Sequence, residues 1–289
     1  MTVTEAFDTF KSELELPDSK QVQASNAQKD IRARLANHLY APDSLLTGSY
    51  ARHTKIYPLD DIDILLIRNT QKVAVSTDGS GISPNQALDE VAEAIRKAYL
   101  QTATVKKQSR SVNAQIKGLD FGFDIIPAWL RNPDGYWIPD TDSNSWLPTN
   151  PEWHAELMTT ANANLQQRLK PVIKMVKHWN RNNLELLRSF HIELICKDIF
   201  ATWQLPNYPV GVAAVLAKMG PYIGQQMMDP AYGSCRVDKP LSTEDRDKLI
   251  QRVNGDGGRA IEALQLEIAG SHAAAIEKWK YIFISGFPK

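Results

Sequence analysis

Two aspartates separated by one residue, Asp61 and Asp63, are the side chains in this sequence with the most evident chemistry. They open an apolar stretch, residues 62–67, whose composition predicts a β-strand. Because side chains alternate between the two faces of a strand, both carboxylates are expected to point the same way. Neighbouring carboxylates repel one another unless a cation lies between them, and Mg²⁺ prefers carboxylate and phosphate oxygens. The pattern therefore predicts a magnesium site.

A third carboxylate, Asp124, lies in a second predicted strand, residues 121–128, which read FGFDIIPA. If the two strands pair, Asp61, Asp63 and Asp124 converge on one point. Such a set can hold two metal ions about 4 Å apart, which clamp the attacking and leaving oxygens of phosphoryl or nucleotidyl transfer. We therefore predict that these three aspartates are catalytic residues and ligands of two Mg²⁺ ions, with Mn²⁺ as a substitute.

Gly48 and Ser49 form a predicted turn upstream of the paired aspartates. Glycine allows close approach, and the turn offers a backbone N–H group and a hydroxyl to a triphosphate. A D-x-D motif alone is most often a solvated loop or turn. The ordered set of a Gly-Ser turn, a D-x-D strand and a second strand with one aspartate before a proline is much more specific. This set resembles the polymerase-β-like nucleotidyltransferase superfamily.

A basic stripe follows in the C-terminal half, where residues 151–181 predict a helix that breaks or restarts at Pro171. Its cations recur every three or four residues and therefore share one face; they are Lys170, Lys174, Lys177 and Arg181. A solvated helix face is the ordinary explanation. The carboxylates upstream favour phosphate contact instead, because a triphosphate also needs cations on its β- and γ-phosphates.

The next predicted helix, residues 188–203, begins with three side chains that allow two interpretations each. Ser189 could cap the helix or contact a nucleotide. Phe190 could be a core aromatic or a platform for a base. His191 is expected to be packed or hydrogen-bonded rather than catalytic. Arg52, which follows the Gly-Ser turn, is assigned to the nucleotide site as well.

Two segments narrow the resemblance. VIKMVKHWN and RSFHIELI are similar to helices of a group that includes the animal 2′-5′ oligoadenylate synthetases, cyclic GMP–AMP synthase and the bacterial cGAS/DncV-like nucleotidyltransferases, or CD-NTases. The resemblance covers roughly residues 44–287. It implies Lys174 and Lys177 as ligands of the donor triphosphate, Ser189 as a nucleotide contact and Phe190 as a base platform.

The segments SWLPTNPEWH and WKYIFISGFPK resemble the bacterial branch in particular. That branch belongs to CBASS anti-phage operons and makes cyclic di- or trinucleotide signals. The resemblance therefore implies an enzyme that joins ribonucleoside triphosphates into such a product, releases pyrophosphate and serves a downstream effector. No histidine clusters with a cysteine pair, and no long basic platform is evident. Direct nucleic-acid binding is therefore not indicated, which favours a protein or metabolite trigger, or constitutive activity.

The same residues are also compatible with other functions. Within the superfamily, they are linear 2′-5′ oligoadenylate synthesis, tRNA end addition and adenylylation of a small molecule. Outside it, the chain could be an inactive scaffold that binds nucleotide or protein, although an intact set of three acids argues against that. A chance motif in a structural protein is the remaining alternative, and the ordered set of matches argues against it.

The composition is that of an ordinary globular protein. The chain has 289 residues, is 43% hydrophobic and carries 33 basic and 33 acidic side chains, so its formal net charge is zero. A protein that coats nucleic acid by bulk charge needs a basic surface instead. Two cysteines are too few for a disulfide framework, so we expect a cytoplasmic protein. Neither a signal peptide nor an apolar stretch of about 18 residues is present, so no membrane span is expected.

Hydrophobic periodicity and turn residues predict an α+β fold with two lobes and an active-site cleft between them. We expect a nucleotidyltransferase core with a mixed sheet and N-terminal helices over residues 1–150, and a helical, oligoadenylate-synthetase-like domain over residues 151–289. Further predicted helices cover residues 3–15, 18–40, 85–101, 210–227, 242–253 and 259–280, the last two separated by a turn at Gly255–Gly258. Further strands are predicted at residues 44–46, 103–106 and 111–117.

Three other segments are predicted from their composition. Residues 69–85 predict an exposed loop, and residues 131–151 predict an irregular connection between the lobes or over the mouth of the active site, held by Trp137 and Trp146. The aromatic residues near the end of the sequence are expected to pack onto the body of the protein; they are Trp279, Tyr281, Phe283 and Phe287.

Overall fold

The computed structural model describes residues 1–69, 81–233 and 235–288. Its described strands are β1 (Asp43–Leu46), β2 (Asp61–Ile67), β3 (Ala103–Lys107), β4 (Val112–Ile116), β5 (Gly122–Leu130), β6 (Tyr136–Asp140) and β7 (Ser145–Thr149). Its described α-helices are α1 (Val3–Glu13), α2 (Asp18–His38), α3 (Gly48–Ala51), α4 (Pro84–Tyr99), α5 (Pro151–Asn164), α6 (Leu169–Asn182), α7 (Ser189–Ile199), α8 (Tyr208–Lys218), α9 (Thr243–Ile268) and α10 (His272–Phe283).

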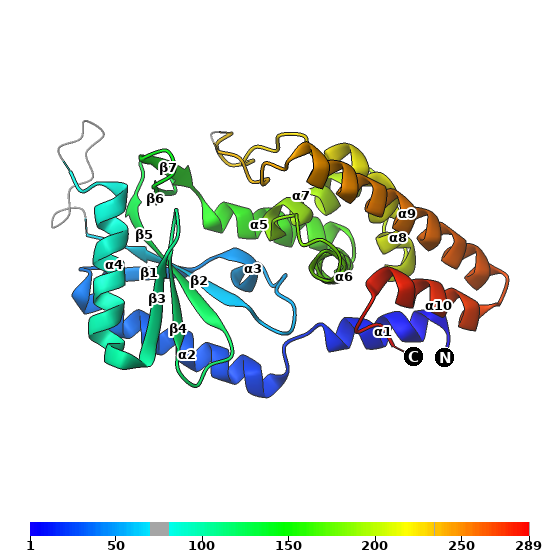
Figure 1. The fold of residues 1–289 in the computed structure, drawn as a ribbon, viewed down its shortest axis with the longest axis horizontal. Helices are drawn as coiled ribbons and strands as arrows, with labels where there is room; N and C mark the ends of the chain where they lie inside the picture. Colours follow the sequence, from blue (N-terminus) through cyan, green and yellow to red (C-terminus); the bar gives the residue numbers. More distant parts are fainter. Residues whose placement is uncertain (70–80, 234, 289) are drawn as a thin grey trace.

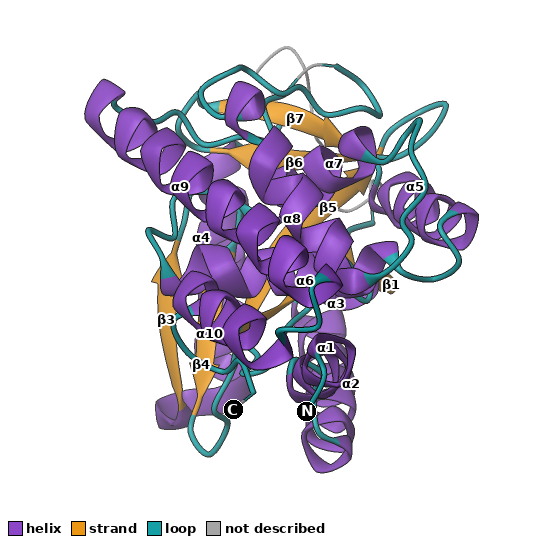
Figure 2. Cartoon of the chain, turned by 90° about the vertical axis from the view of Figure 1, so that its right-hand side faces the viewer, coloured by secondary structure: helices purple, strands orange, loops and turns teal. Residues whose placement is uncertain are grey.

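The strands gather in one lobe and the later helices in another, which confirms the α+β architecture (Figure 1). The main sheet has the order β1-β2-β5-β4-β3, and β6 and β7 extend from the end of β5. The strands β2 and β5 are parallel, whereas β1, β3 and β4 pair antiparallel with their neighbours. The sheet is therefore mixed, and Figure 2 shows helices around its strands.

The sheet lobe has its own hydrophobic core, which α2 and α4 form together with the strands. In α4 the side chains of Leu88, Val91 and Ile95 are buried, as their spacing predicts. This helix begins with a capping box in which Ser83 and Gln86 each bond the other's backbone N–H. Of the predicted loop at residues 69–85, residues 70–80 lie outside the described residues.

Helix α1 packs with the helical lobe rather than with the sheet. Phe7 lies 4.9 Å from Trp279 in an edge-to-face arrangement, and Phe10 lies 4.6 Å from Phe283, measured between ring centroids. The ends of the chain therefore lie near each other on this lobe (Figure 1). The division at residues 150 and 151 stays a prediction, but the N-terminal helix of the first segment contributes to the core of the second.

The predicted irregular connection over residues 131–151 is wrong, because this segment forms the hairpin of β6 and β7. The two strands carry Pro139 and Pro148 and lack a regular alternation of apolar side chains, which hid them from a pattern search. Trp146 packs edge to face on Trp129 at 4.8 Å, so this tryptophan does anchor the segment.

Two helix ends differ from the prediction. The interruption between α5 and α6 lies at residues 165–168, and Pro171 is the third residue of α6. Proline is tolerated there because the first turn of a helix needs no backbone N–H donor. Helix α8 ends at Lys218 rather than at residue 227, and a short 3₁₀ turn, Gly220–Tyr222, follows.

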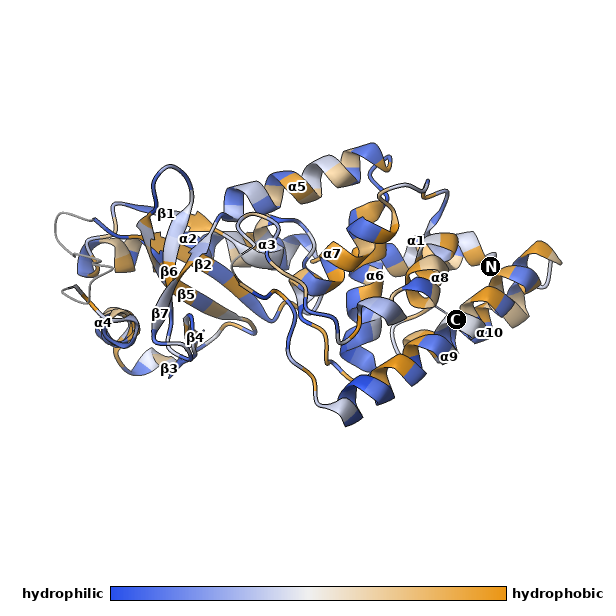
Figure 3. Ribbon diagram, turned by 90° about the horizontal axis from the view of Figure 1, so that it is seen from above, coloured by the Kyte–Doolittle hydropathy of each residue, from blue (hydrophilic) through white to orange (hydrophobic). Residues whose placement is uncertain are grey.

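The predicted turn at Gly255–Gly258 is also wrong, because α9 runs through it without a break. Gly257 is buried, and a Cβ atom there would lie 3.0 Å from the backbone of Ala217 on α8. The glycine therefore permits a close crossing of two helices rather than a turn. Figure 3 shows hydrophilic and hydrophobic segments alternating along α9, as expected for a helix with one buried face.

The expectation for the last aromatic residues holds for three of the four. Trp279, Phe283 and Phe287 are buried, but Tyr281 is 56% exposed. None of the described helices is long and apolar enough to cross a bilayer.

Gly257→Val is expected to lower the free energy of unfolding by about 1–3 kcal/mol, because the larger side chain must force α8 and α9 apart. Gly258→Ala is the matched control, since nothing lies within 4 Å of a Cβ atom at that position. The control should be neutral or stabilise the helix by about 1 kcal/mol. Urea unfolding of the two variants measures the difference, and equal losses would contradict the close crossing.

Candidate active site

The three predicted carboxylates lie on the two parallel strands at the centre of the sheet. Asp61 and Asp63 belong to β2 and Asp124 to β5, and the register sets Asp63 opposite Asp124 and Asp61 opposite Gly122. A Cβ atom on Gly122 would lie 2.3 Å from an oxygen of Asp61, so this glycine leaves room for the carboxylate. Pairing of the strands therefore brings the three acids together.

The Gly-Ser turn lies directly beside these acids. Gly48 has a φ of +64°, and a Cβ atom there would lie 1.7 Å from Oδ2 of Asp63. The backbone N–H of Thr47 donates to the carbonyl of Asp63 at 2.9 Å. Only glycine fits this position, because both the positive φ and the close approach exclude a side chain.

A cavity of about 560 Å³ between the lobes joins the acids to the helices. Of the residues assigned from the sequence, nine line it, namely Gly48, Ser49, Arg52, Asp61, Asp63, Asp124, Lys177, Ser189 and Phe190. Lys174 is not among the lining residues. The sequence assignments therefore meet in one space, with one exception.

The carboxylates carry more charge repulsion than the protein itself balances. Burial raises the pKa of Asp61, Asp63 and Asp124. For Asp63, burial and repulsion from Asp124 together raise the pKa to about 6. Hydrogen bonds from Asn113 offset part of the shift at Asp61 and Asp124. A site whose acids resist ionisation in this way favours an added cation.

Asn113 on β4 is a residue of this site that the sequence patterns did not indicate. Its side-chain amide donates to Oδ1 of Asp61 at 3.0 Å and to Oδ1 of Asp124 at 2.9 Å. One donor group thus lies between two carboxylates. No sequence signal marks it, because its role follows from the pairing of Asn113 with Asp124 across β4 and β5.

The donor set fits a hard divalent cation. Among the described residues, no group of three or more His, Cys, Asp or Glu side chains lies close enough together to hold a metal ion as the side chains stand. The three aspartates nevertheless all line the cavity, and burial is the main reason that their pKa values are raised. Oxygen ligands of this kind suit Mg²⁺, and Asn113 donates a hydrogen bond to two of the three carboxylates.

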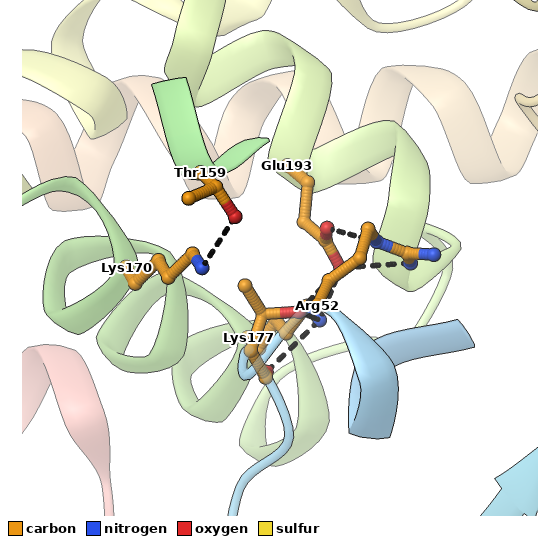
Figure 4. Close-up of polar contacts among 6 residues, drawn as sticks. Arg52, Thr159, Lys170, Lys177 and Glu193 are labelled. Atoms are coloured by element: carbon orange, nitrogen blue, oxygen red, sulfur yellow. Dashed lines mark hydrogen bonds and ion pairs between the residues drawn. The ribbon is translucent and has the colours of Figure 1, made fainter. Parts of the chain in front are cut away.

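A buried glutamate, Glu193 on α7, holds the cations of the site. Arg52 donates to it twice, from Nε at 2.6 Å and from Nη2 at 3.1 Å, and Lys177 donates at 2.7 Å. The hydroxyl of Thr54 adds a bond at 2.8 Å. Figure 4 shows Arg52 and Lys177 converging on this carboxylate from two different elements. The cluster thereby joins the segment after α3 to α6 and α7.

The charge balance of this cluster explains how two cations stay buried. Burial alone would raise the pKa of Glu193, but Lys177 and Arg52 outweigh that effect and hold it at about 2. Burial lowers the pKa of Lys177, and Glu193 opposes the change. This glutamate was not assigned from the sequence, although it lies within the RSFHIELI segment that carries the resemblance. It positions residues of the cavity without lining it.

The start of α7 contributes to the cavity as well. Ser189 is the first residue of the helix, whose N-cap is Arg188. The Phe190 ring is half-buried, and the guanidinium of Arg52 lies 4.6 Å from its centroid. His191 is buried, and neither of its ring nitrogens has a hydrogen-bond partner among the described residues. The histidine is therefore packed, as expected.

The basic stripe of α6 divides into two parts. Lys177 and Arg181 line the cavity, and Arg181 pairs with Asp60 at its edge. Lys174 pairs instead with Glu15, whose two carboxylate oxygens both lie 2.6 Å from its Nζ. Figure 4 shows Lys170 directed toward Thr159, and its Nζ lies 3.4 Å from the hydroxyl of that residue.

Lys55 is a further cation of the cavity that the sequence did not indicate. Its Nζ lies 4.5 Å from the centroid of the Tyr50 ring. Burial lowers its pKa, and repulsion from Lys174 adds to the effect. A single lysine after the Gly-Ser turn has no motif of its own, so only the fold identifies it.

Glu193→Gln is expected to lower the free energy of unfolding by about 3–5 kcal/mol, because it leaves Arg52 and Lys177 buried without their counter-charge. Glu156→Gln, at an exposed position on α5, is the matched control and should change stability little. Urea unfolding at neutral pH measures both. A loss at Glu193 no larger than that of the control would show that the cluster is not an obligatory ion pair.

Asp63→Asn is expected to raise the melting temperature of the metal-free protein more at pH 7.5 than at pH 5. The pKa of Asp63 is raised from 3.8 to about 6 in the folded protein, so folding favours the protonated acid. That contribution is full below the unfolded pKa and is lost as the pH rises through about 6. Calorimetry in a chelator measures the effect, with Asp8→Asn on the surface as control. A fall in melting temperature at pH 7.5 would contradict it.

Comparison with known proteins identifies the family of this chain. Residues 1–162, more than half of the chain, match the model of the SMODS family, described as the Second Messenger Oligonucleotide or Dinucleotide Synthetase domain. A cyclic AMP-AMP-AMP synthase from Acinetobacter sp. is 30% identical over 305 residues, which cover 100% of this chain and 86% of that protein. The CBASS oligonucleotide cyclase CdnC from Escherichia coli is 28% identical over 205 residues, covering 64% of this chain and 62% of that protein.

Solved structures share the fold at lower identity. CdnC of E. coli MS115-1, solved with ATP, has a TM-score of 0.76 and 20% identity and covers 99% of both chains. The same protein has been solved in a complex with HORMA-deltaN, with a TM-score of 0.75, 20% identity and coverage of 99% of this chain and 98% of that one. The apo form of Vibrio cholerae DncV has a TM-score of 0.81 and 10% identity and covers 100% of this chain and 96% of that one. The family match and the full-length relative together show that this chain belongs to the SMODS family of second messenger oligonucleotide or dinucleotide synthetases.

Proposed function

We propose that this protein joins ribonucleoside triphosphates into a cyclic di- or trinucleotide and releases pyrophosphate at each step. The observation that carries the proposal is the convergence of three carboxylates from two paired strands with a glycine turn and buried cations in one cavity. Acids for metal ions and cations for phosphates are the two requirements of nucleotidyl transfer. The names of the relatives, a cyclic AMP-AMP-AMP synthase and a CBASS oligonucleotide cyclase, support a cyclic product.

The carboxylates of Asp61, Asp63 and Asp124 would hold two Mg²⁺ ions, with Mn²⁺ as a substitute. When bound, these ions neutralise charge on the phosphate oxygens and favour ionisation of the attacking hydroxyl. Asn113 would orient Asp61 and Asp124, to which it donates in this structure.

The donor triphosphate would lie along the Gly-Ser turn and the starts of the helices that border the cavity. Ser49 and Ser189 offer hydroxyl groups, and Lys177 and Arg181 offer positive charge. Arg52, which lies over the Phe190 ring, would hold that ring as a platform for a base. Lys174 would reach a phosphate only by leaving Glu15, so its sequence assignment requires a change of partner on binding.

In the transfer step, a ribose hydroxyl oxygen of the acceptor attacks the α-phosphorus of the donor. The new P–O bond forms as the bond to the β-phosphate oxygen breaks, and pyrophosphate leaves with that electron pair. Asp124 would accept the hydroxyl proton, a role that its raised pKa suits. The linear intermediate then turns so that its triphosphate becomes the donor and its free hydroxyl closes the ring.

The chain's partners follow from this reaction. The substrates are ribonucleoside triphosphates of the cytoplasm, and the product would activate a downstream effector in anti-phage defence. The complex of CdnC with HORMA-deltaN supports a protein activator for this chain as well. Direct nucleic-acid binding forms no part of the proposal, because the formal net charge is zero.

Incubation of the purified protein with Mg²⁺ and the four ribonucleoside triphosphates, followed by phosphatase and mass spectrometry, tests the proposal. A cyclic product resists phosphatase because it has no terminal phosphate, and its mass gives the bases and the ring size. The variant that combines Asp61→Asn with Asp63→Asn should lose at least 10³-fold in rate, roughly the scale of an essential electrostatic contact. Asp120→Asn, exposed before β5, is the matched control.

The other outcomes separate the alternatives. A linear product that loses its terminal phosphates would replace the cyclic reaction by oligoadenylate-type synthesis. A normal rate in the double aspartate variant would remove the three acids from the mechanism. Absence of any product with and without a candidate HORMA-type activator would favour an inactive scaffold.

A further inference from the structure

A second cavity, of about 550 Å³, lies on the helical lobe and shares none of its lining residues with the active-site cavity. It is bounded by the end of α6, one face of α9 and the end of α10. The lining residues are Asn182, Asn183, Leu184, Lys248, Gln251, Arg252, Gly255, Arg259, Tyr281 and Ile284. The reaction proposed above uses none of them.

The lining of this second cavity is basic. Lys248, Arg252 and Arg259 lie four and seven residues apart on α9, so they share one face of the helix. None of the residues that line the cavity is acidic. Lys248 pairs with the exposed Glu244 at 2.5 Å, which salt and solvent weaken. The cavity therefore offers positive charge to a ligand.

One buried acid beneath the cavity holds the two arginines in place. Asp256 is fully buried and accepts from Arg252 Nε at 2.7 Å, from Arg259 Nη1 at 3.1 Å and from Trp179 Nε1 at 2.8 Å. This network fixes α9 on α6, which is a structural role. A single carboxylate balances only one of two guanidinium groups, so a positive charge is left over at the base of the cavity.

Two polar atoms on side chains of the lining are buried and lack hydrogen-bond partners among the described residues, namely Nη2 of Arg252 and Oδ1 of Asn183. A large aromatic surface lies beside them. Tyr281 is 56% exposed, and the Arg259 guanidinium lies 4.4 Å from its ring centroid. Ile284 adds an apolar wall that is 57% exposed. Positive charge and a flat apolar wall thus occur in one nucleotide-sized space.

We infer that this cavity binds a small organic phosphate, with the phosphate on the arginines and Lys248 and the organic part on Tyr281 and Ile284. Guanidinium groups match phosphate geometry, and a flat ring stacks well on tyrosine and on arginine. A hollow of this volume suits a small molecule rather than an extended acidic peptide.

One segment of the chain connects this cavity with the active-site cavity. The connection between α6 and α7 contributes Asn183 and Leu184 to the second cavity and Glu185, Leu187 and Arg188 to the first. A ligand that binds one arrangement of this connection more tightly shifts its population. We expect ligand binding in the second cavity to change the rate of the reaction at the active site. This regulatory effect rests on the proposed function, whereas the binding itself does not.

Calorimetric titration with AMP, in the absence of Mg²⁺, tests the binding. Gln251→Glu places a negative charge in the cavity, and Tyr281→Ala removes the aromatic wall; both positions are exposed, so both variants should fold. We expect each variant to weaken AMP binding in the second cavity at least tenfold. AMP binding in the active-site cavity should be unchanged. Lys278→Gln, on α10 outside the cavity, is the matched control and should bind as the unaltered protein does.

Hydrogen exchange shows which segments of the chain AMP contacts or stabilises. AMP should slow exchange in peptides that contain residues 182–184 and 281–284, and Gln251→Glu should abolish that protection. Unchanged AMP binding in Gln251→Glu, or no protection in these peptides, would overturn the inference. Inorganic phosphate that binds as tightly as AMP would overturn the assignment of the organic part. These measurements need no turnover, so a failure of the proposed reaction would leave them interpretable.

Discussion

The parallel pairing of β2 and β5 is the constraint on which the rest of the site depends, because it holds together carboxylates that repel one another. Sheet hydrogen bonds fix the register that sets Asp63 opposite Asp124. Burial and repulsion then raise the pKa of Asp63 to about 6, and the amide of Asn113 bridges Asp61 and Asp124. A rigid sheet thus stores unfavourable electrostatics at one point. A divalent cation bound there, as we propose, would offset this repulsion.

Glu193 holds two cations of the cavity, Arg52 and Lys177, in place. Without its carboxylate, Arg52 and Lys177 would be buried cations with no counter-ion, which is strongly unfavourable for folding. Because Arg52 follows α3 while Lys177 and Glu193 belong to α6 and α7, the same cluster ties the glycine turn to the helical lobe. Acids on the sheet and cations held by Glu193 line one cavity, and the triphosphate and metal ions that we propose as its contents would complement both.

Local patterns predicted the parts of the fold that local forces determine. The apolar strands, the acids on them and the periodic face of α4 were all evident in the sequence, and the structure has them. Contacts between distant segments were not evident. Lys174 pairs with Glu15, which is 159 residues away, so no spacing rule could remove it from the cavity. Gly257 indicates a turn by composition but serves a helix crossing, and β6 and β7 lack the alternation of half-buried strands. Asn113 and Glu193 have roles that exist only once strands and helices are assembled.

The most direct test of the account is whether the three aspartates bind a divalent metal together with a nucleotide. Electron paramagnetic resonance can count Mn²⁺ ions bound to the protein in the presence of a non-hydrolysable ATP analogue. We expect two bound Mn²⁺ ions in the unaltered protein and loss of this binding in the variant that combines Asp61→Asn with Asp63→Asn. Equal Mn²⁺ binding by both proteins would contradict the central claim that these carboxylates form the metal site.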